Sequence, residues 1–293
     1  YTPGEKFVIQ PALPDAALHT IGYSYRYCGG DATFVIIPKL YIDQGCVLHY
    51  DRDDYFAGSL AEPMSCIIGG YKVNYHNNFA THEHKMGIVE GGNCAIMAGV
   101  GPMGLGAIDY ALHGPKKPGL LVVADINAAR LARAERIFSP EYAAKEGVRL
   151  VYLDTSAGDT VQRMMDISGG KGYDDVYVYA PVSALIEQAD AVLAKDGCLN
   201  FFAGPTDNKL SARFNFYDVH YKYTHVAGNT GGNAEDMEDC IALMNAGKLH
   251  PEVMITHVGG LDSAAETTIN LPNIPGGKKL VYAHISMPMT AID

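Results

Sequence analysis

Short apolar runs alternate with amphipathic segments along the chain between residues 94 and 228. The apolar runs are strand-sized, whereas the segments between them repeat their apolar positions with a helical period. This alternation predicts an α/β fold with a doubly wound parallel sheet. The expected strands are 94–98, 119–125, 149–153, 173–179, 198–204 and 225–228, and the expected helices are 105–112, 127–137, 160–167 and 183–194.

The first 60 residues have a different pattern, because apolar runs at 6–10, 32–37 and 46–50 are separated by residues typical of turns. They predict a β-rich module. The tyrosines of segment 23–27 are interpreted as part of a half-buried edge strand rather than a ligand site.

Segment 59–71 is apolar on several sides and is expected to be a buried helix with Glu62 near its start. The polar segment 72–92 is expected to be a connection. Its residues 81–84, Thr-His-Glu-His, are interpreted as a solvated loop, because their spacing differs from that of a His-Glu-x-x-His metal site. Segment 234–246 predicts an amphipathic helix, and strands at 255–258 and 279–285 are expected to rejoin the first β module. The expected domains are therefore 1–68, 69–230 and 231–293.

The composition of the chain excludes some classes of partner. The chain has 293 residues, is 48% hydrophobic and carries a net charge of −11 with no basic tract, which argues against nucleic acid or an anionic membrane as a partner. No apolar run could span a bilayer and no secretory signal is present, so a cytoplasmic protein is expected. Six cysteines without a Cys-x-x-Cys pair indicate reduced, mostly buried thiols. Because the chain starts with Tyr1, we expect that amino-terminal sequence is missing.

A glycine motif follows the strand at 94–98. Its residues are Gly99, Val100, Gly101, Pro102, Met103 and Gly104. In a Gly-x-Gly-x-x-Gly turn between a strand and a helix, the first glycine makes the turn, the second admits a pyrophosphate, and the third lets the helix pack closely. The strand, turn, helix and next strand stand in the order that a dinucleotide-binding site requires.

Asp125 ends the second strand, 21 residues after Gly104, where a carboxylate can bind the adenosine ribose. It favours NAD over NADP, because it would repel a 2′-phosphate. Arg130 leaves NADP open and also fits the adenine edge. Ligands of such sheets bind beyond the carboxyl ends of the strands. Further cofactor contacts are therefore expected from Ala180, Pro181, Val182, Ala203, Gly204, Asn229 and Thr230.

Taken together, these features resemble the medium-chain, zinc-dependent alcohol and polyol dehydrogenase family over nearly the whole chain. The matching residues are Glu62-Pro63, Gly99 to Gly104, Asp125 with Arg130, Asp196-Gly197, Ile255-Thr-His257 and Pro275-Gly-Gly-Lys-Lys279. Segments 93–101, 198–205 and 215–221 resemble most closely the branch that reduces L-sorbose 1-phosphate.

The resemblance implies a Rossmann domain, a GroES-like β-rich domain and a homo-oligomer. It also implies hydride transfer between a nicotinamide and a ketose phosphate, with zinc as Lewis acid. Glu62 matches the position that binds the zinc or its water. The family's other zinc ligands, a Cys and a Gly-His-Glu histidine, have no match, and segment 12–29 lacks the four-cysteine lobe. The resemblance thus implies a truncated, inactive fragment whose catalytic residues lie upstream of Tyr1.

The residues are also compatible with two other functions. A methyltransferase would share the glycine turn and the acid, but it would not explain Glu62-Pro63 or the returning β segment. A non-catalytic dinucleotide-binding sensor or scaffold would be consistent with the missing zinc ligands.

Overall fold

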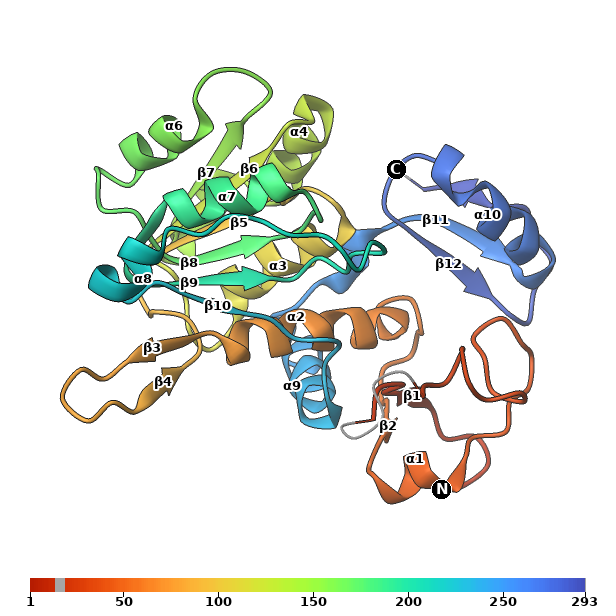
Figure 1. Ribbon diagram of the computed structural model, residues 1–293. Coiled ribbons are helices and arrows are strands. Elements are labelled where there is room, and N and C mark those ends of the chain that lie inside the picture. The colour runs from red at the N-terminus through yellow and green to blue at the C-terminus, as the bar shows by residue number, and fades with distance from the viewer. Residues whose placement is uncertain (14–18, 293) are drawn as a thin grey trace. The chain divides into compact units, whose positions relative to one another are not determined.

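The six strands expected between residues 94 and 228 form one parallel sheet in the computed structural model, which describes residues 1–13 and 19–292. The strand order is β10-β9-β8-β5-β6-β7 (Figure 1). The sheet is a doubly wound Rossmann sheet, because the order reverses between β5 and β8. Its strands are β5 (Asn93–Met97), β6 (Leu120–Asp125), β7 (Arg149–Asp154), β8 (Tyr173–Val178), β9 (Leu193–Phe201) and β10 (His225–Ala227).

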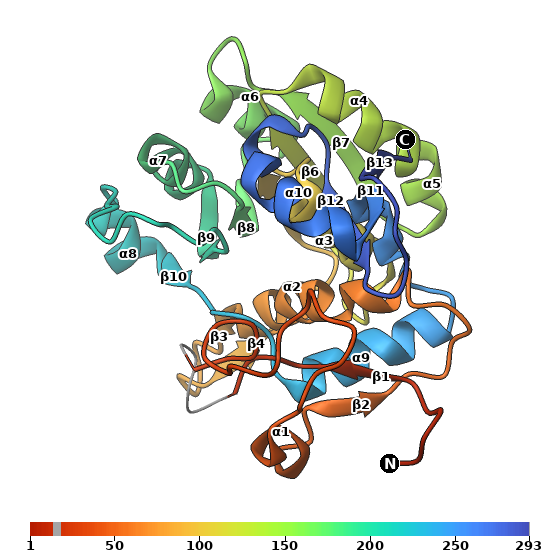
Figure 2. The same cartoon turned by 90° about the vertical axis from the view of Figure 1, so that its right-hand side faces the viewer.

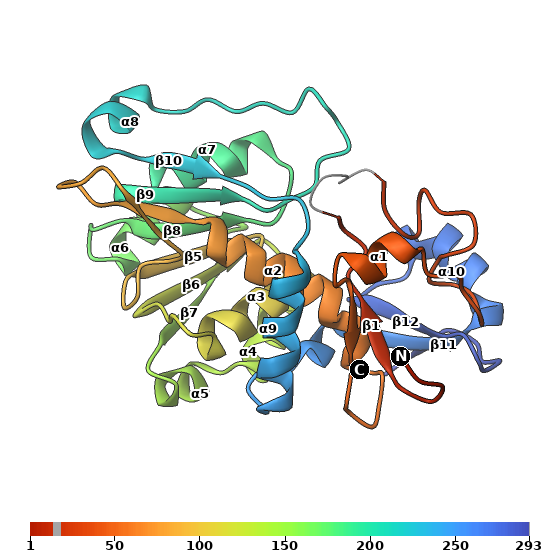
Figure 3. The same cartoon turned by 90° about the horizontal axis from the view of Figure 1, so that it is seen from below.

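Helices cover both faces of this sheet. On one face, Met164 of α6 (Thr160–Ile167) and Ile186 of α7 (Ser183–Ala191) pack into a core with Ala95, Val122 and Val176 of the strands. Helices α3 (Pro102–His113) and α4 (Ala128–Ile137) cover the other face (Figure 3). Both faces of the sheet are therefore shielded from solvent, which explains why its strands are continuous apolar runs.

The chain divides into two compact units. One contains residues 67–230 and is called the sheet unit here; the other contains residues 1–66 and 231–293 and is called the terminal unit. Helix α2 (Ala61–Val73) contributes residues to both. The expected buried helix at 59–71 is confirmed as α2, preceded by a 3₁₀ turn at Gly58–Leu60.

One predicted helix boundary was wrong. Helix α7 ends at Ala191 rather than 194, and β9 begins at Leu193, which pairs with Tyr173 of β8. The register of the β8–β9 pair then shifts, and Asp196 has a positive φ of 63°. Because of this irregularity, residues 193–197 do not show the regular pattern of a strand, and the sequence did not predict that β9 begins there. Helices α5 (Pro140–Lys145) and α8 (Phe216–Lys222) were not predicted, because both are too short to show helical periodicity.

Segment 72–92, which was expected to be a connection, contains two strands. Strands β3 (Tyr75–Asn77) and β4 (His84–Met86) form an antiparallel hairpin. The expected solvated loop at 81–84 is exposed, although its last residue, His84, belongs to β4 and stacks on Tyr75 with ring centroids 4.2 Å apart.

The terminal unit has two small sheets. Strands β1 (Phe7–Ile9) and β2 (Val47–His49) pair antiparallel, while β11 (Ile255–Gly260) lies between β12 (Lys278–Tyr282) and β13 (Thr290–Ala291). Figure 2 shows α10 (Ala264–Asn270) beside β11 and β12. The unit also contains α1 (Lys39–Asp43) and α9 (Ala234–Asn245), the latter capped by a box between Asn233 and Asp236. Short 3₁₀ turns lie at Pro251–Met254, Leu261–Ser263 and Leu271–Asn273.

Two predictions for the first 60 residues were wrong. Segments 23–27 and 32–37 contain no strand. Tyr23 is 89% exposed and Phe34 is 91% exposed, so the aromatic and apolar side chains there do not alternate between a buried and an exposed face. Of segment 12–29, residues 14–18 lie outside the described residues.

The cysteines agree with the sequence. None of the six cysteines is in a disulfide; five are buried and Cys66 is half-buried. None of the helices in the described part of the chain combines the length and the apolar composition that a membrane span requires.

Candidate dinucleotide-binding site

The glycine motif forms the turn between β5 and α3. The N–H of Gly99 donates to the carbonyl of Ala124 on the neighbouring strand β6, with a distance of 3.2 Å. Gly101 is the N-cap of α3, has extended backbone and provides no side-chain cap, and Pro102 follows at the first helical position. The amino end of α3 therefore presents peptide N–H groups that no capping side chain satisfies, which suits a phosphate.

The three glycines meet different surroundings. A Cβ on Gly104 would lie 2.2 Å from the carbonyl oxygen of Gly99, and one on Gly99 would lie 2.8 Å from Ile96. A Cβ on Gly101 would meet no atom within 4 Å. The first and third glycines are thus required by packing, whereas the second leaves an open approach to the backbone. The residues present fit a dinucleotide pyrophosphate.

Asp125 lies at the end of β6 beside this turn. Its carboxylate accepts the N–H of Val100 at 3.3 Å through one oxygen and the N–H of Asn127 at 2.9 Å through the other. The half-buried carboxylate is therefore fixed in orientation next to the glycine turn. Arg130 lies in the first turn of α4 with an exposed side chain, and its own N–H donates to the capping oxygen of Asn127.

The predicted strand ends lie along the same edge of the sheet. The N–H of Tyr179 donates to Met97 of β5, and the N–H groups of Phe202 and Ala203 both donate to Val178 of β8. These bonds bring the segment after β8, with Ala180, Pro181 and Val182, next to the glycine turn, and Ala203 and Gly204 next to β8. Pro181, Val182, Gly204 and Thr230 are exposed, while Ala180, Ala203 and Asn229 are half-buried.

Sequence reasoning did not anticipate Gly70 and Tyr179 beside this edge, where both contact Phe202. Gly70 of α2 is buried, and a Cβ built on it would lie 3.2 Å from the ring of Phe202 and 3.5 Å from the amide oxygen of Asn229. Phe202 also stacks on Tyr179, with centroids 4.5 Å apart and an interplanar angle of 26°. The signal available in the sequence was a glycine in the interior of an otherwise apolar helix.

Glu62 lies in the first turn of α2 in the terminal unit. Its carboxylate accepts the thiol of Cys66 one turn later, with 3.2 Å between Oε1 and Sγ. Burial, reinforced by the charge of Glu62, raises the pKa of Cys66 to about 12, so the thiol stays protonated. The part of the chain that the structure describes groups no three His, Cys, Asp or Glu side chains in a metal-binding arrangement. These donors do not fit a complete zinc site, and Glu62 stays a proposal as a single ligand.

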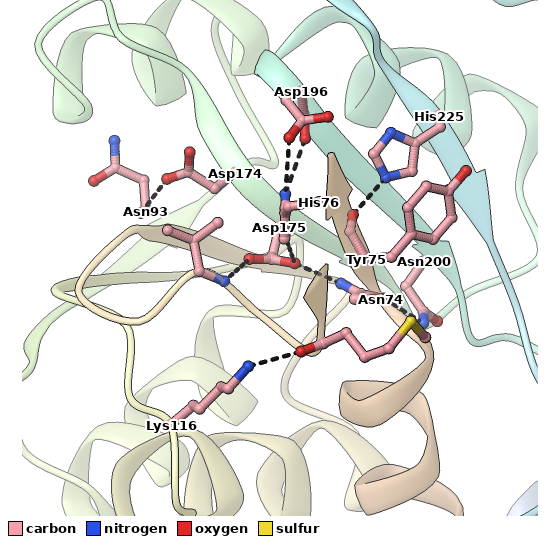
Figure 4. Close-up of polar contacts among 12 residues, drawn as sticks. Asn74, Tyr75, His76, Asn93, Lys116, Asp174, Asp175, Asp196, Asn200 and His225 are labelled. Atoms are coloured by element: carbon pink, nitrogen blue, oxygen red, sulfur yellow. Dashed lines mark hydrogen bonds and ion pairs between the residues drawn. The ribbon is translucent and has the colours of Figure 1, made fainter. Parts of the chain in front are cut away.

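A buried polar network holds the β3–β4 hairpin to the sheet (Figure 4). The ring of His76 has its Nε2 3.2 Å from a carboxylate oxygen of Asp175 and its Nδ1 3.0 Å from the carbonyl of Asp196. Asp175 also accepts Asn74 at 2.7 Å and the N–H of Val89 at 3.0 Å. Because both ring nitrogens face acceptors, the imidazolium satisfies the arrangement best.

Protonation of His76 has a consequence for stability. Burial opposes the charged ring, but the hydrogen bond and charge of Asp175, aided by Asp196, outweigh it and raise the pKa of His76. A raised pKa in the folded state stabilises the protein fully below the ordinary histidine value of about 6.5. That stabilisation is lost as the pH rises through the folded-state pKa. His225 of β10 is a second titratable ring beside His76, with 6.2 Å between the ring centroids.

We therefore expect the free energy of unfolding to fall as the pH rises above about 6.5 and through the raised pKa of His76. In His76→Gln the fall should be smaller, because the titrating group is gone. Urea unfolding followed by circular dichroism at several pH values checks this. The matched control is His220→Gln, which removes an exposed histidine of α8. Equal pH slopes for His76→Gln and the wild type would contradict the assignment.

Comparison with known proteins places this geometry in a family. The model of the zinc-binding dehydrogenase family matches residues 102–246. The whole chain aligns with mannitol-1-phosphate 5-dehydrogenase of Aliivibrio fischeri, at 51% identity and over 70% of that protein. It aligns equally completely with L-sorbose 1-phosphate reductase of Klebsiella pneumoniae, at 46% identity and over 70% of that protein.

A solved structure from Sinorhizobium meliloti 1021, named as a zinc-binding dehydrogenase and bound to NADP, has the same fold. Its TM-score is 0.74 at 19% identity, over 97% of this chain and 78% of the other. Two observations identify the family: the sequence identity to these two relatives over the whole of this chain, and the Rossmann sheet with its glycine turn. The chain belongs to the zinc-binding dehydrogenase family of alcohol and polyol dehydrogenases.

Proposed function

We propose that the sheet unit binds NAD along the carboxyl edge of its strands and that the chain serves the interconversion of a ketose phosphate and an alditol phosphate. The observation that carries the cofactor half is the carboxylate of Asp125, which accepts the N–H of Val100 inside the glycine turn. An acid held there by two backbone N–H groups can accept both hydroxyls of the adenosine ribose.

The same carboxylate supports NAD over NADP. A 2′-phosphate would have to approach a negative charge whose position the two N–H bonds fix. Arg130 is the nearest basic residue along the chain that could offset this charge. Its exposed side chain gives it freedom to move, so NADP binding is the outcome that would argue against the proposal.

A bound nicotinamide would supply hydride exchange between the carbinol of an alditol phosphate and the carbonyl of a ketose phosphate, with the accompanying proton exchanged with solvent, and the chain would bind and orient it. The glycine turn would hold the pyrophosphate, Asp125 the adenosine ribose, and the segments after β8, β9 and β10 the nicotinamide half. No step is assigned to a metal.

The substrate half is supported by the two relatives that are named for phosphorylated polyols and ketoses. It is tested by titrating the complex of the chain and NADH with L-sorbose 1-phosphate in a calorimeter, with unphosphorylated L-sorbose as the matched control. We expect the phosphate ester to bind at least tenfold more tightly than the free sugar, with little loss of NADH absorbance, because the described residues do not form a complete zinc site. NADH binding without a preference for the phosphate ester would contradict the substrate half for this chain and would favour a sensor or scaffold.

A further inference from the structure

Three strand ends that line the predicted cofactor edge converge on one aromatic ring, that of Phe202. The segment after β8 reaches it through Tyr179, whose ring stacks on it at 4.5 Å. Phe202 itself follows β9. The segment after β10 comes to the same place through Asn229, because the side chains of Asn229 and Phe202 both lie against Gly70 of α2.

Helix α2 cannot move away from this ring without breaking buried hydrogen bonds. The amide of Asn200, which is fully buried on β9, donates to the carbonyl of Gly70 at 2.9 Å and to the side-chain oxygen of Asn74 at 2.8 Å. The distance between α2 and β9 is therefore set at the turn that contains Gly70. The space left by the missing side chain of Gly70 is filled by Phe202.

The backbone beside the ring is fixed as well. The N–H groups of Phe202 and Ala203 share the carbonyl of Val178 at 3.2 and 3.1 Å. Gly204, the next residue, is exposed and would accommodate a Cβ without meeting any atom within 4 Å. The ring of Phe202, fixed by its contacts, therefore directly precedes the exposed backbone at Gly204. A binding segment needs such support from rigid neighbours to hold a ligand in position.

We propose that Phe202, held between Tyr179 and Gly70, is a positioning residue for the nicotinamide half of the dinucleotide. The inference rests on the proposed NAD-binding function. A doubly wound sheet binds the two halves of a dinucleotide on its two halves of strands. Asp125 assigns the adenosine to the side of β5, β6 and β7, which leaves the nicotinamide to the ends of β8, β9 and β10, where this ring lies.

The test compares two ligands on each variant, NADH and ADP-ribose, because ADP-ribose lacks the nicotinamide. Isothermal titration calorimetry gives both dissociation constants. Phe202→Leu is expected to weaken NADH binding about tenfold and to leave ADP-ribose binding within about twofold of the wild type. Phe201→Leu is the matched control, since Phe201 packs in the core on the other face of the sheet.

Gly70→Ala provides a second variant should Phe202→Leu fail to fold. Its added methyl presses on the ring of Phe202, while alanine is a better helix former than glycine. We expect selective loss of NADH affinity, about tenfold, without a lower melting temperature. Equal losses of NADH and ADP-ribose affinity, or no loss of either in a folded variant, would overturn the positioning role. If the wild type binds neither ligand, the proposed NAD site itself fails.

Discussion

Replacing Gly104 with alanine is expected to lower the free energy of unfolding by about 2 kcal/mol and to abolish NADH binding. The added Cβ would lie 2.2 Å from the carbonyl oxygen and 2.4 Å from the carbonyl carbon of Gly99. These are backbone atoms, so the turn or helix α3 must shift, and overpacking of this kind costs about 1–3 kcal/mol or more. Urea unfolding and NADH titration of the same preparation measure both effects.

Gly101→Ala is the matched control for this prediction. Its Cβ would meet no atom within 4 Å, and its φ of −72° suits any residue. We expect this variant to unfold within about 0.5 kcal/mol of the wild type but to bind NADH at least tenfold more weakly, because the methyl occupies the approach of the pyrophosphate. Normal NADH binding by Gly101→Ala would show that the phosphates do not pass there.

Replacing Asp125 with asparagine is expected to weaken NADH binding about 10- to 100-fold. A hydrogen bond to a charged partner contributes about 1.5–3 kcal/mol, and asparagine offers the ribose one neutral oxygen in place of two charged ones. NADPH binding should change less, because the repulsion of its 2′-phosphate is removed together with the charged acceptor. The ratio of the two dissociation constants should therefore move toward one.

The control for this charge is Asp154→Asn. Asp154 is the register partner of Asp125 at the end of β7, and its carboxylate accepts the N–H of Ser156. The two aspartates end adjacent strands, but only Asp125 lies beside the glycine turn. Titrations of both variants with NADH and NADPH should show a change for Asp125→Asn alone. An equal loss in both variants would indicate a general effect of charge at this edge.

The central sheet could be predicted from the sequence because its physical signals are local. A parallel strand buried on both faces is a continuous apolar run, and the glycine turn is a short motif with a steric reason for each glycine. The position of Asp125 followed from its spacing alone. For these elements, neighbours in the sequence determine most of the outcome.

The remaining features depend on contacts that are distant in sequence. The β3–β4 hairpin is polar and exposed on one side, and it is held by His76 and Asn74 reaching Asp175 about 100 residues later. The role of Gly70 becomes visible only when Phe202, 132 residues further on, is placed against it. No hydrophobic period encodes either contact. The apolar segment at 32–37 gave the opposite error, because it was predicted to be a strand but is largely exposed and forms none.

The most direct test of the NAD site is a crystal structure of the chain with NADH. We predict that the pyrophosphate lies against the N–H groups of the turn at Gly101, that the adenosine ribose hydroxyls bind Asp125, and that the nicotinamide lies over the ends of β8 and β9 beside Ala203. A dinucleotide bound at another edge of the sheet, or with its adenosine on the side of β9 and β10, would contradict this account.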